Sequence, residues 1–183
     1  EVMKRVEKVK ESRLASVASA TRNKALTPTL FAQISQPDSS YLAVPEVSSE
    51  RRKYIPIAFL PAEIIASNKI QLISNASLYL FGIMTSEMHM TWMRYTCGRL
   101  KSDFSYSNTI VYNNFPFPIT RIDAQKKKVE EAAQAVLDIR SKYPDSTLAD
   151  LYDPVTMPPD LLKAHVALDK AVDLCYRSQA FAN

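Results

Sequence analysis

Apolar and polar residues follow two different spacings along this chain, and the two spacings predict two kinds of structure. Apolar and β-branched runs bounded by turn residues predict strands over residues 30–34, 41–47, 54–60, 69–74 and 109–112. Apolar residues three and four positions apart predict helices over residues 2–22, 75–97 and 160–176. The charged, alanine-rich run 120–143 consists of strong helix formers and predicts another helix, and a short capped helix is expected over 146–152. Every predicted strand precedes Pro118, and only helices follow it. We therefore expect an α+β protein, with a mixed α/β domain containing a small sheet over residues 1–118 and a small all-α domain over residues 119–183.

Some residues inside these runs predict where the elements end or break. Pro56 lacks an amide proton, so the strand over 54–60 is expected at a sheet edge or a bulge. Gly82, together with Thr85 and Ser86, is expected to divide the run 75–97 into two helices, and either hydroxyl can cap the second one.

The stretch 98–118 carries the most specific pattern in the chain. Gly98 follows a long helical run and is expected to end that helix. From Lys101 onward the side chains alternate, which would place Lys101, Asp103 and Ser105 on one face of an extended segment and two aromatic rings on the other. A polar triplet between a helix end and a buried strand is the arrangement expected of a loop that contacts a ligand.

The distribution of charge favours a polyanionic partner for the first part of the chain. The net charge is +4, but residues 1–118 contain 14 basic and 9 acidic residues, whereas residues 119–183 contain 9 and 10. Such an excess is typical of, though not specific to, proteins that bind nucleic acid. In the second part, Lys126–Lys128 precede Glu130 and Glu131 and are expected to be solvated helix surface.

The sequence offers little chemistry for catalysis. Its two glycines cannot form a phosphate-binding glycine-rich loop, and it has none of the spacings typical of a zinc site or a nucleophilic serine. We expect no catalytic, cofactor-binding or metal-binding residue within these residues. His89 is expected to be a structural or surface residue, and His165 to lie on a helix face.

Cysteine usage and hydropathy indicate where the protein would act. Cys97 and Cys175 lack partner spacing, which suits a reducing cytoplasm. No apolar run approaches the roughly 20 residues of a membrane span. The chain starts without Met and inside a predicted helix, so we expect it to be a piece of a longer protein.

Four motifs in the chain resemble the C-terminal part of MmeI-like restriction–modification enzymes, and they are Leu80–Ser86, Met88–Met90, Gly98–Ser107 and Val111–Pro118. The resemblance covers about residues 41–118 closely and the helical tail from Leu151 to Tyr176 more weakly. Enzymes of this family are single bacterial chains with an adenine-N6 DNA methyltransferase domain. The resemblance implies that residues 1–118 are a DNA target recognition domain, followed by a small helical C-terminal domain.

The resemblance also implies roles for individual residues. In the family, the first and third residues after Gly-Arg-Leu contact one base pair, and these are Lys101 and Asp103 here. Lys can donate to guanine and Asp can accept from cytosine, so the pair suits G·C. Ser105 is expected to reach a neighbouring base. Four basic residues are expected to contact phosphates, which positions the protein without specifying sequence, and these are Arg51, Arg52, Lys53 and Arg99.

The sequence departs from the family in lacking the methyltransferase motifs. There is no glycine-rich S-adenosylmethionine loop, and Pro158-Pro159 lies between Met157 and Asp160 rather than in an Asn-Pro-Pro-Phe motif. By resemblance, the parent protein would use S-adenosylmethionine, with possible use of Mg²⁺. The partners of this chain would be double-stranded DNA and the N-terminal methyltransferase domain of the same polypeptide, with no membrane partner.

Other interpretations stay open at the level of sequence. Lys101 and Asp103 could be an ordinary surface pair, which stabilises a protein little. The whole chain could be a non-DNA interaction domain, in which the basic N-terminal helix binds an acidic protein. A free-standing enzyme is the third alternative, and the glycine count argues against it.

Overall fold

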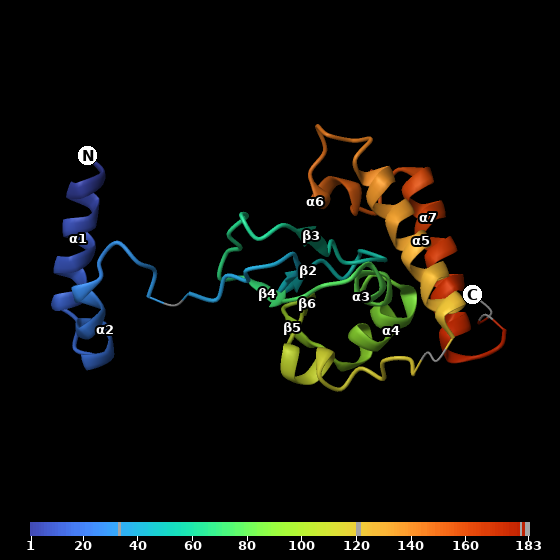
Figure 1. The fold of residues 1–183 in the computed structure, drawn as a ribbon, viewed down its shortest axis with the longest axis horizontal. Coiled ribbons are helices and arrows are strands. Elements are labelled where there is room, and N and C mark those ends of the chain that lie inside the picture. The colour runs from blue at the N-terminus through green and yellow to red at the C-terminus, as the bar shows by residue number, and fades with distance from the viewer. Residues whose placement is uncertain (33, 120–121, 180, 182–183) are drawn as a thin grey trace. The chain divides into compact units, whose positions relative to one another are not determined.

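The computed structural model describes residues 1–32, 34–119, 122–179 and 181, and the chain divides into two compact units, Glu1–Gln36 and Pro37–Asn183 (Figure 1). Each unit is held together by its own contacts. Among the described residues, no helix combines the length and apolar character that crossing a bilayer would require.

The first unit is helical, but its helix is shorter than predicted. It comprises α1 (Val2–Leu14), α2 (Ser19–Asn23) and a 3₁₀ turn, η1 (Lys24–Leu26). The prediction of one helix over 2–22 is therefore wrong. The chain leaves the helix after Leu14, and the Arg22 guanidinium stabilises the break by donating to the carbonyls of Ser16 and Val17 at 2.9 and 2.8 Å.

The segment after η1 is fixed by a side chain from α1 rather than by strand pairing. The Arg13 guanidinium donates to the carbonyls of Lys24, Thr27 and Leu30 at 2.8, 2.9 and 2.8 Å. Residues 30–32 and 34 belong to no strand, so the strand predicted over 30–34 is wrong as far as the structure describes it; Gln33 lies outside the described residues. An apolar run becomes a strand only where another strand pairs with it.

The second unit contains two small antiparallel sheets. The first has the order β3–β1–β4, with β3 at Ala58–Leu60, β1 at Tyr41–Pro45 and β4 at Ile70–Ile73. The second has the order β2–β6–β5, with β2 at Val47–Ser48, β6 at Asp103–Ser105 and β5 at Gly98–Leu100. The strand predicted over 69–74 is thus confirmed as β4, whereas the one predicted over 41–47 divides at Glu46 into β1 and β2, which belong to different sheets. The one over 54–60 is shortened to β3, because Tyr54–Ile57 bury side chains without joining a ladder.

The predicted pair of helices over 75–97 is confirmed as α3 (Leu78–Met84) and α4 (Glu87–Thr96). Ser86 caps α4 by accepting from the His89 amide, as predicted. Gly82, however, lies inside α3 and not at the break. Its missing side chain makes room for α5 (Asp123–Arg140) and α7 (Pro159–Tyr176), because a Cβ there would lie 2.7 Å from Val129 Cγ1 and 3.3 Å from Leu168 Cδ1.

Residues 98–112 differ from the prediction in two ways. α4 ends at Thr96, and Gly98 begins a strand without positive φ, so it is not a helix cap. The strand predicted over 109–112 is instead a π-helical turn, η2 (Asn108–Tyr112). Its carbonyls are satisfied by side chains rather than by a neighbouring strand: the Trp92 indole donates to Val111 O at 2.9 Å, and the Asn114 amide donates to Thr109 O and Ile110 O at 2.8 and 3.0 Å.

The helical tail is confirmed and packs directly on the mixed part. It consists of α5 (Asp123–Arg140), α6 (Leu148–Leu151) and α7 (Pro159–Tyr176), while Thr120 and Arg121 lie outside the described residues. Figure 1 shows α5 and α7 side by side, and both contact α3. One hydrophobic core includes Leu42 of β1, Phe81 of α3, Val136 of α5 and Leu168 of α7. The domain division near Pro118 stays a prediction.

A buried polar network accompanies this core. The Arg140 side chain on α5 donates to the Tyr152 hydroxyl and, at 2.8 Å, to the carbonyl of Ile57. The same hydroxyl lies 2.7 Å from Nε2 of His165, which is itself buried and stacks on the Tyr54 ring. The predicted helix-face residue His165 is therefore an interior one, and the helical tail is joined to the 54–57 segment by polar as well as apolar contacts.

Candidate nucleic-acid interface

The sheet β2–β6–β5 has one buried face and one exposed face. Phe104 of β6 is paired with Ser48 and Arg99 and is only 3% exposed. Side chains that alternate with Phe104 point the other way. They form a surface that we call the outer face, which consists of Val47, Gly98, Leu100, Asp103 and Ser105.

The outer face carries two of the three predicted base-contacting residues. Asp103 and Ser105 share it, as the alternation predicted, and both are partly exposed. Gly98 lies directly opposite Ser105, and because it has no side chain it leaves Ser105 accessible from this side. The outer face thus combines the polar side chains of Asp103 and Ser105 with the exposed apolar side chains of Val47 and Leu100.

Lys101 lies elsewhere than predicted. It occupies the turn between β5 and β6, with Ser102, at φ 57, so it does not share a strand face with Asp103. The alternation was interrupted because the segment forms a hairpin rather than one strand. A left-handed conformation costs a residue with a side chain about 1–2 kcal/mol. The exposed lysine at the tip of the β5–β6 hairpin is therefore held in a strained conformation next to the outer face.

Arg99 lies on the buried face, opposite the outer face. Its guanidinium carbon is 4.4 Å from the centre of the Phe104 ring. Nη1 donates to the Ser102 carbonyl at 2.9 Å and lies 3.3 Å from Oε2 of Glu50. Arg99 thus contacts the hairpin turn, the hairpin strand and the loop after β2 at once.

The predicted basic triplet does not form one patch. Arg51 is exposed, and Lys53 is exposed with its ammonium 5.3 Å from the centre of the Tyr54 ring. Arg52 between them is half-buried, and it donates to the carbonyl of Ala149 at 3.2 Å and towards the Ser48 hydroxyl at 3.5 Å. Two side chains of the triplet are available to a ligand, while the third ties the loop to α6.

A polar cluster at the junction of the two sheets was missed by the sequence analysis. Glu46 separates β1 from β2, and its carbonyl accepts the Tyr106 amide at 2.7 Å. Its carboxylate accepts from the Gln71 amide at 2.9 Å and lies 3.5 Å from Nζ of Lys69. A lone charged residue inside the predicted strand over 41–47 was the available signal, since a glutamate there must lie at a strand end or on an exposed face.

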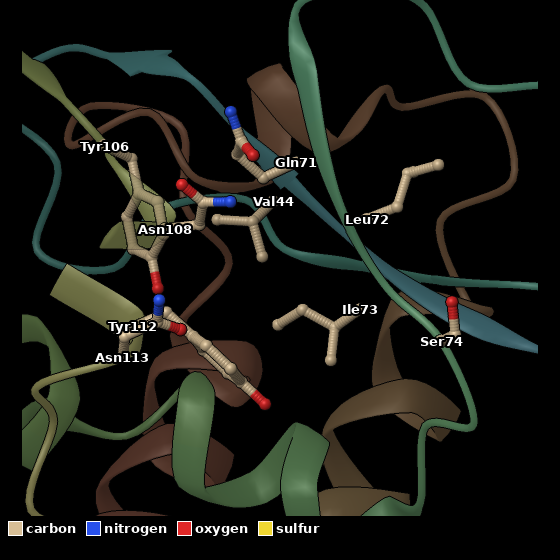
Figure 2. Close-up of a pocket in the computed structure, with 9 residues that line it drawn as sticks. All are labelled: Val44, Gln71, Leu72, Ile73, Ser74, Tyr106, Asn108, Tyr112 and Asn113. Carbon is tan, nitrogen blue, oxygen red and sulfur yellow. The ribbon is translucent and has the colours of Figure 1, made fainter. Parts of the chain in front are cut away.

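A shallow pocket of about 250 Å³ lies where the first sheet faces the segment after β6. Figure 2 shows Val44 and Ile73 on one side and the rings of Tyr106 and Tyr112 on the other, with the Asn108 amide between Tyr106 and Val44. The pocket is therefore lined by β1 and β4 of the first sheet and by the segment 106–113, which directly follows Ser105 in the chain.

His89 supports the end of β6 from within. It is fully buried, and its Nε2 lies 3.2 Å from the Tyr106 hydroxyl. Burial lowers the pKa of His89 to about 4. The alternative of a surface histidine is therefore wrong, and the structural one is confirmed. Among the side chains that the structure describes, no three His, Cys, Asp or Glu residues are grouped as a metal ion would require.

Comparisons with known proteins match both parts of the chain to domains of the same family. A family model described as the MmeI target recognition domain matches residues 1–119, and one described as the MmeI C-terminal domain matches residues 121–183. DNA methyltransferase A of Bacillus subtilis (strain 168) is 42% identical over 182 residues, which are 98% of this chain and 20% of that protein.

A solved structure agrees as well. It is described as the type IIL restriction-modification enzyme MmeI in complex with DNA, and it is 52% identical with a TM-score of 0.86, covering 94% of this chain and 23% of the solved one. The present chain thus spans about a fifth of the curated relative's length. It belongs to the MmeI family, with that family's target recognition domain over residues 1–119 and its C-terminal domain over residues 121–183.

Proposed function

We propose that this chain is the DNA target recognition module of a longer adenine-N6 DNA methyltransferase of the restriction–modification type. The observation that carries the proposal is the β5–β6 hairpin, whose tip presents a lysine at φ 57 beside an outer face containing Asp103 and Ser105. Two-residue hairpin turns of the favoured types require a positive φ at their first residue, and here that residue is an exposed lysine rather than glycine, which adopts this conformation without strain. Strained residues of this kind cluster at binding sites. The solved relative was determined with DNA bound, which supports the same assignment.

In this proposal the hairpin contacts base edges in the major groove. The ammonium of Lys101 would donate to O6 or N7 of guanine, and the carboxylate of Asp103 would accept from N4 of cytosine. A hairpin turn allows the two side chains to approach the two members of one G·C pair from adjacent positions. Ser105, with no side chain opposite it at Gly98, would reach a neighbouring base.

Phosphate contacts would come from the basic residues around the hairpin. Arg51 and Lys53 are exposed and suit this role best. Arg52 and Arg99 already donate to protein carbonyls, so both suit this role less well. Phosphate contacts would fix the register of the module on DNA without selecting a sequence.

The residues of this chain do not fit S-adenosylmethionine. Gly82 is packed inside α3 and Gly98 lies in β5, and neither has the positive φ of a phosphate-type or nucleotide-type glycine loop. We assign that cofactor, and Mg²⁺ if the parent cleaves DNA, to the methyltransferase part of the parent polypeptide. The chain's partners would then be double-stranded DNA and that methyltransferase domain, in the cytoplasm.

A binding experiment with this chain tests the proposal. Fluorescence anisotropy with a labelled duplex of random sequence should give an affinity whose logarithm falls linearly with the logarithm of salt concentration. Selection from a randomised duplex library should then enrich one motif that contains a fixed G·C pair. If no duplex binds at low salt, the proposal fails and the protein-interaction alternative is favoured.

A further inference from the structure

We infer that Arg99 is a positioning residue, which holds the tip of the β5–β6 hairpin for base contact and does not bind phosphate. This inference rests on the proposed function. It adds that the two faces of the sheet β2–β6–β5 have different roles, base contact on the outer face and positioning of the hairpin turn on the opposite face. Three contacts carry it, to Phe104, to Ser102 and to Glu50.

The first argument is the direction of the side chain. Arg99 is paired with Phe104, whereas Asp103 is paired with Leu100 and Ser105 with Gly98. Directly opposed residues in antiparallel strands share a face, so Arg99 points away from the outer face. A group on DNA that meets Asp103 and Ser105 therefore approaches from the side opposite to the Arg99 guanidinium.

The second argument is what the guanidinium holds. Its central carbon lies 4.4 Å from the centre of the Phe104 ring, within the range of a cation–π contact, and Phe104 is part of the hydrophobic core. Nη1 donates to the carbonyl of Ser102, the second residue of the turn that contains Lys101. Arg99 thereby connects the strained turn to the buried Phe104 ring. This restricts the position of the Lys101 backbone, from which the lysine side chain extends.

The third argument is charge. Glu50 lies 3.3 Å from Arg99, and both side chains are about half accessible, at 48% and 44%. A carboxylate this close offsets the attraction of the guanidinium for phosphate. The pair also joins the hairpin to the loop that carries Arg51, so the residue proposed for phosphate contact and the residues proposed for base contact are held in a fixed relation.

Substitutions in the full-length protein that contains this chain separate the two roles. Arg99→Lys keeps the charge but loses the planar fork and the flat stacking surface. Glu50→Gln removes the acidic partner of the Arg99–Glu50 ion pair and changes no residue of the core. Arg51→Gln is the matched control, because it removes an exposed charge from the same loop, and among the described residues the Arg51 side chain makes no hydrogen bond or ion pair with the hairpin. Thermal unfolding of each variant establishes that it is folded.

The measurement is affinity for the selected duplex and for the same duplex with its G·C pair reversed, each over a series of salt concentrations. For Arg99→Lys we expect discrimination between the two duplexes to fall at least fivefold while the salt slope stays unchanged. Glu50→Gln should also reduce discrimination between the two duplexes, but by a smaller factor than Arg99→Lys. Arg51→Gln should weaken binding to both duplexes equally, and its salt slope should fall by about one.

Two results would overturn the inference. One is an Arg99→Lys protein that discriminates like the wild type, which would leave Arg99 without a positioning role. The other is an Arg99→Gln protein that loses affinity equally for both duplexes with a reduced salt slope, which is the behaviour of a phosphate contact. In both cases the wild type still selects its sequence, so the proposed function survives. If the wild type does not discriminate at all, the proposed function fails, and the inference fails with it.

Discussion

The hydroxyl of Tyr54 donates a 2.6 Å hydrogen bond to the carboxylate of Asp169, a residue 115 positions later in the chain. The second oxygen of that carboxylate accepts the Glu87 amide at 2.7 Å, at the start of α4. Burial raises the pKa of Asp169, so this carboxylate depends on its two donors. The contact joins α7, in the C-terminal part, to two segments of the recognition part.

Removing this carboxylate should destabilise residues on both sides of Pro118 together. Asp169→Ala leaves the buried Tyr54 hydroxyl and the partly buried Glu87 amide without an acceptor, and an unsatisfied buried group costs about 1–3 kcal/mol. Tyr54→Phe removes one partner only and should cost about 1 kcal/mol. Urea unfolding followed by both fluorescence and circular dichroism checks this. A double variant that is as unstable as the sum of the single ones would show that the two groups do not interact.

Gly82→Ala should destabilise the protein although alanine favours helices. The new Cβ would lie 2.7 Å from Val129 Cγ1 and 3.2 Å from Ala133 Cβ, and the valine is too stiff to move aside cheaply. Overpacking of this kind costs about 1–3 kcal/mol, against about 1 kcal/mol gained in helix propensity. Adding Val129→Ala should relieve the overlap.

Gly98→Ala is the matched control for this prediction. Its nearest neighbours are 3.7 Å away and its φ is not positive, so we expect little change in the free energy of unfolding. A Gly82→Ala protein that is as stable as the Gly98→Ala protein would show that α3 and α5 can move apart.

Stability should fall as the pH falls below about 6.5. Burial lowers the pKa of His89 to about 4 and that of His165 to about 3, the latter with help from Arg140. Between those values and 6.5, the unfolded chain takes up protons that the folded chain does not. Each histidine therefore removes up to about 1.4 kcal/mol per pH unit. Asp169 acts in the opposite direction, because its raised pKa favours protonation of the folded state, and it offsets part of the loss in acid.

Urea unfolding at several values between pH 4.5 and 7.5, about the range of histidine titration, measures this slope. His89→Gln should flatten it, since glutamine can keep a hydrogen bond to Tyr106 but does not titrate. Equal slopes in the wild type and the variant would mean that His89 is already protonated or solvated in the folded protein.

Exchanging donor and acceptor at the hairpin should change the recognised base pair. In Lys101→Glu with Asp103→Arg, the acidic group can accept from cytosine and arginine can donate to guanine on the other strand. Preference should move from G·C towards C·G at one position, by about 1–3 kcal/mol for each good contact, and other positions should not change. Sequencing the sites that the parent enzyme methylates in a library is the measurement. An unchanged motif in the double variant would leave Lys101 and Asp103 as a surface pair.

The lysines of α5 should not contribute to DNA affinity. Lys127 lies 3.9 Å from Glu131 of α5, and Lys126 is 5.9 Å from the centre of the Tyr79 ring of α3, so each already has a partner within the protein. Changing Lys126–Lys128 to Ala should alter duplex affinity by less than about tenfold, which is 1.4 kcal/mol. A larger loss would place DNA against α5 and would require a second interface.

The sequence predicted the elements whose signals are local. Ser86 capped its helix as expected, and the capping box of Thr147 and Asp150 began α6. Prediction from sequence failed where contacts made by side chains outweigh the backbone preference of a segment. Val111 lies in a π-helical turn because the Trp92 indole satisfies its carbonyl, and no feature of residues 109–112 reveals a tryptophan 19 positions earlier. At the site, the alternation of side chains correctly predicted that Asp103 and Ser105 share a face. It could not reveal the turn at Lys101, because that turn is defined only by the pairing of β5 with β6.

The alternation of β6 has an evolutionary consequence. Phe104 is bound to the core and to Arg99, whereas the residues on either side of it take no part in the core. Under the proposed function, selection for a folded protein and selection for a particular target therefore act on alternate positions of the same strand. A lineage of such proteins would then change its target by replacing Asp103 and Ser105, together with Lys101 in the turn, while every intermediate remained folded.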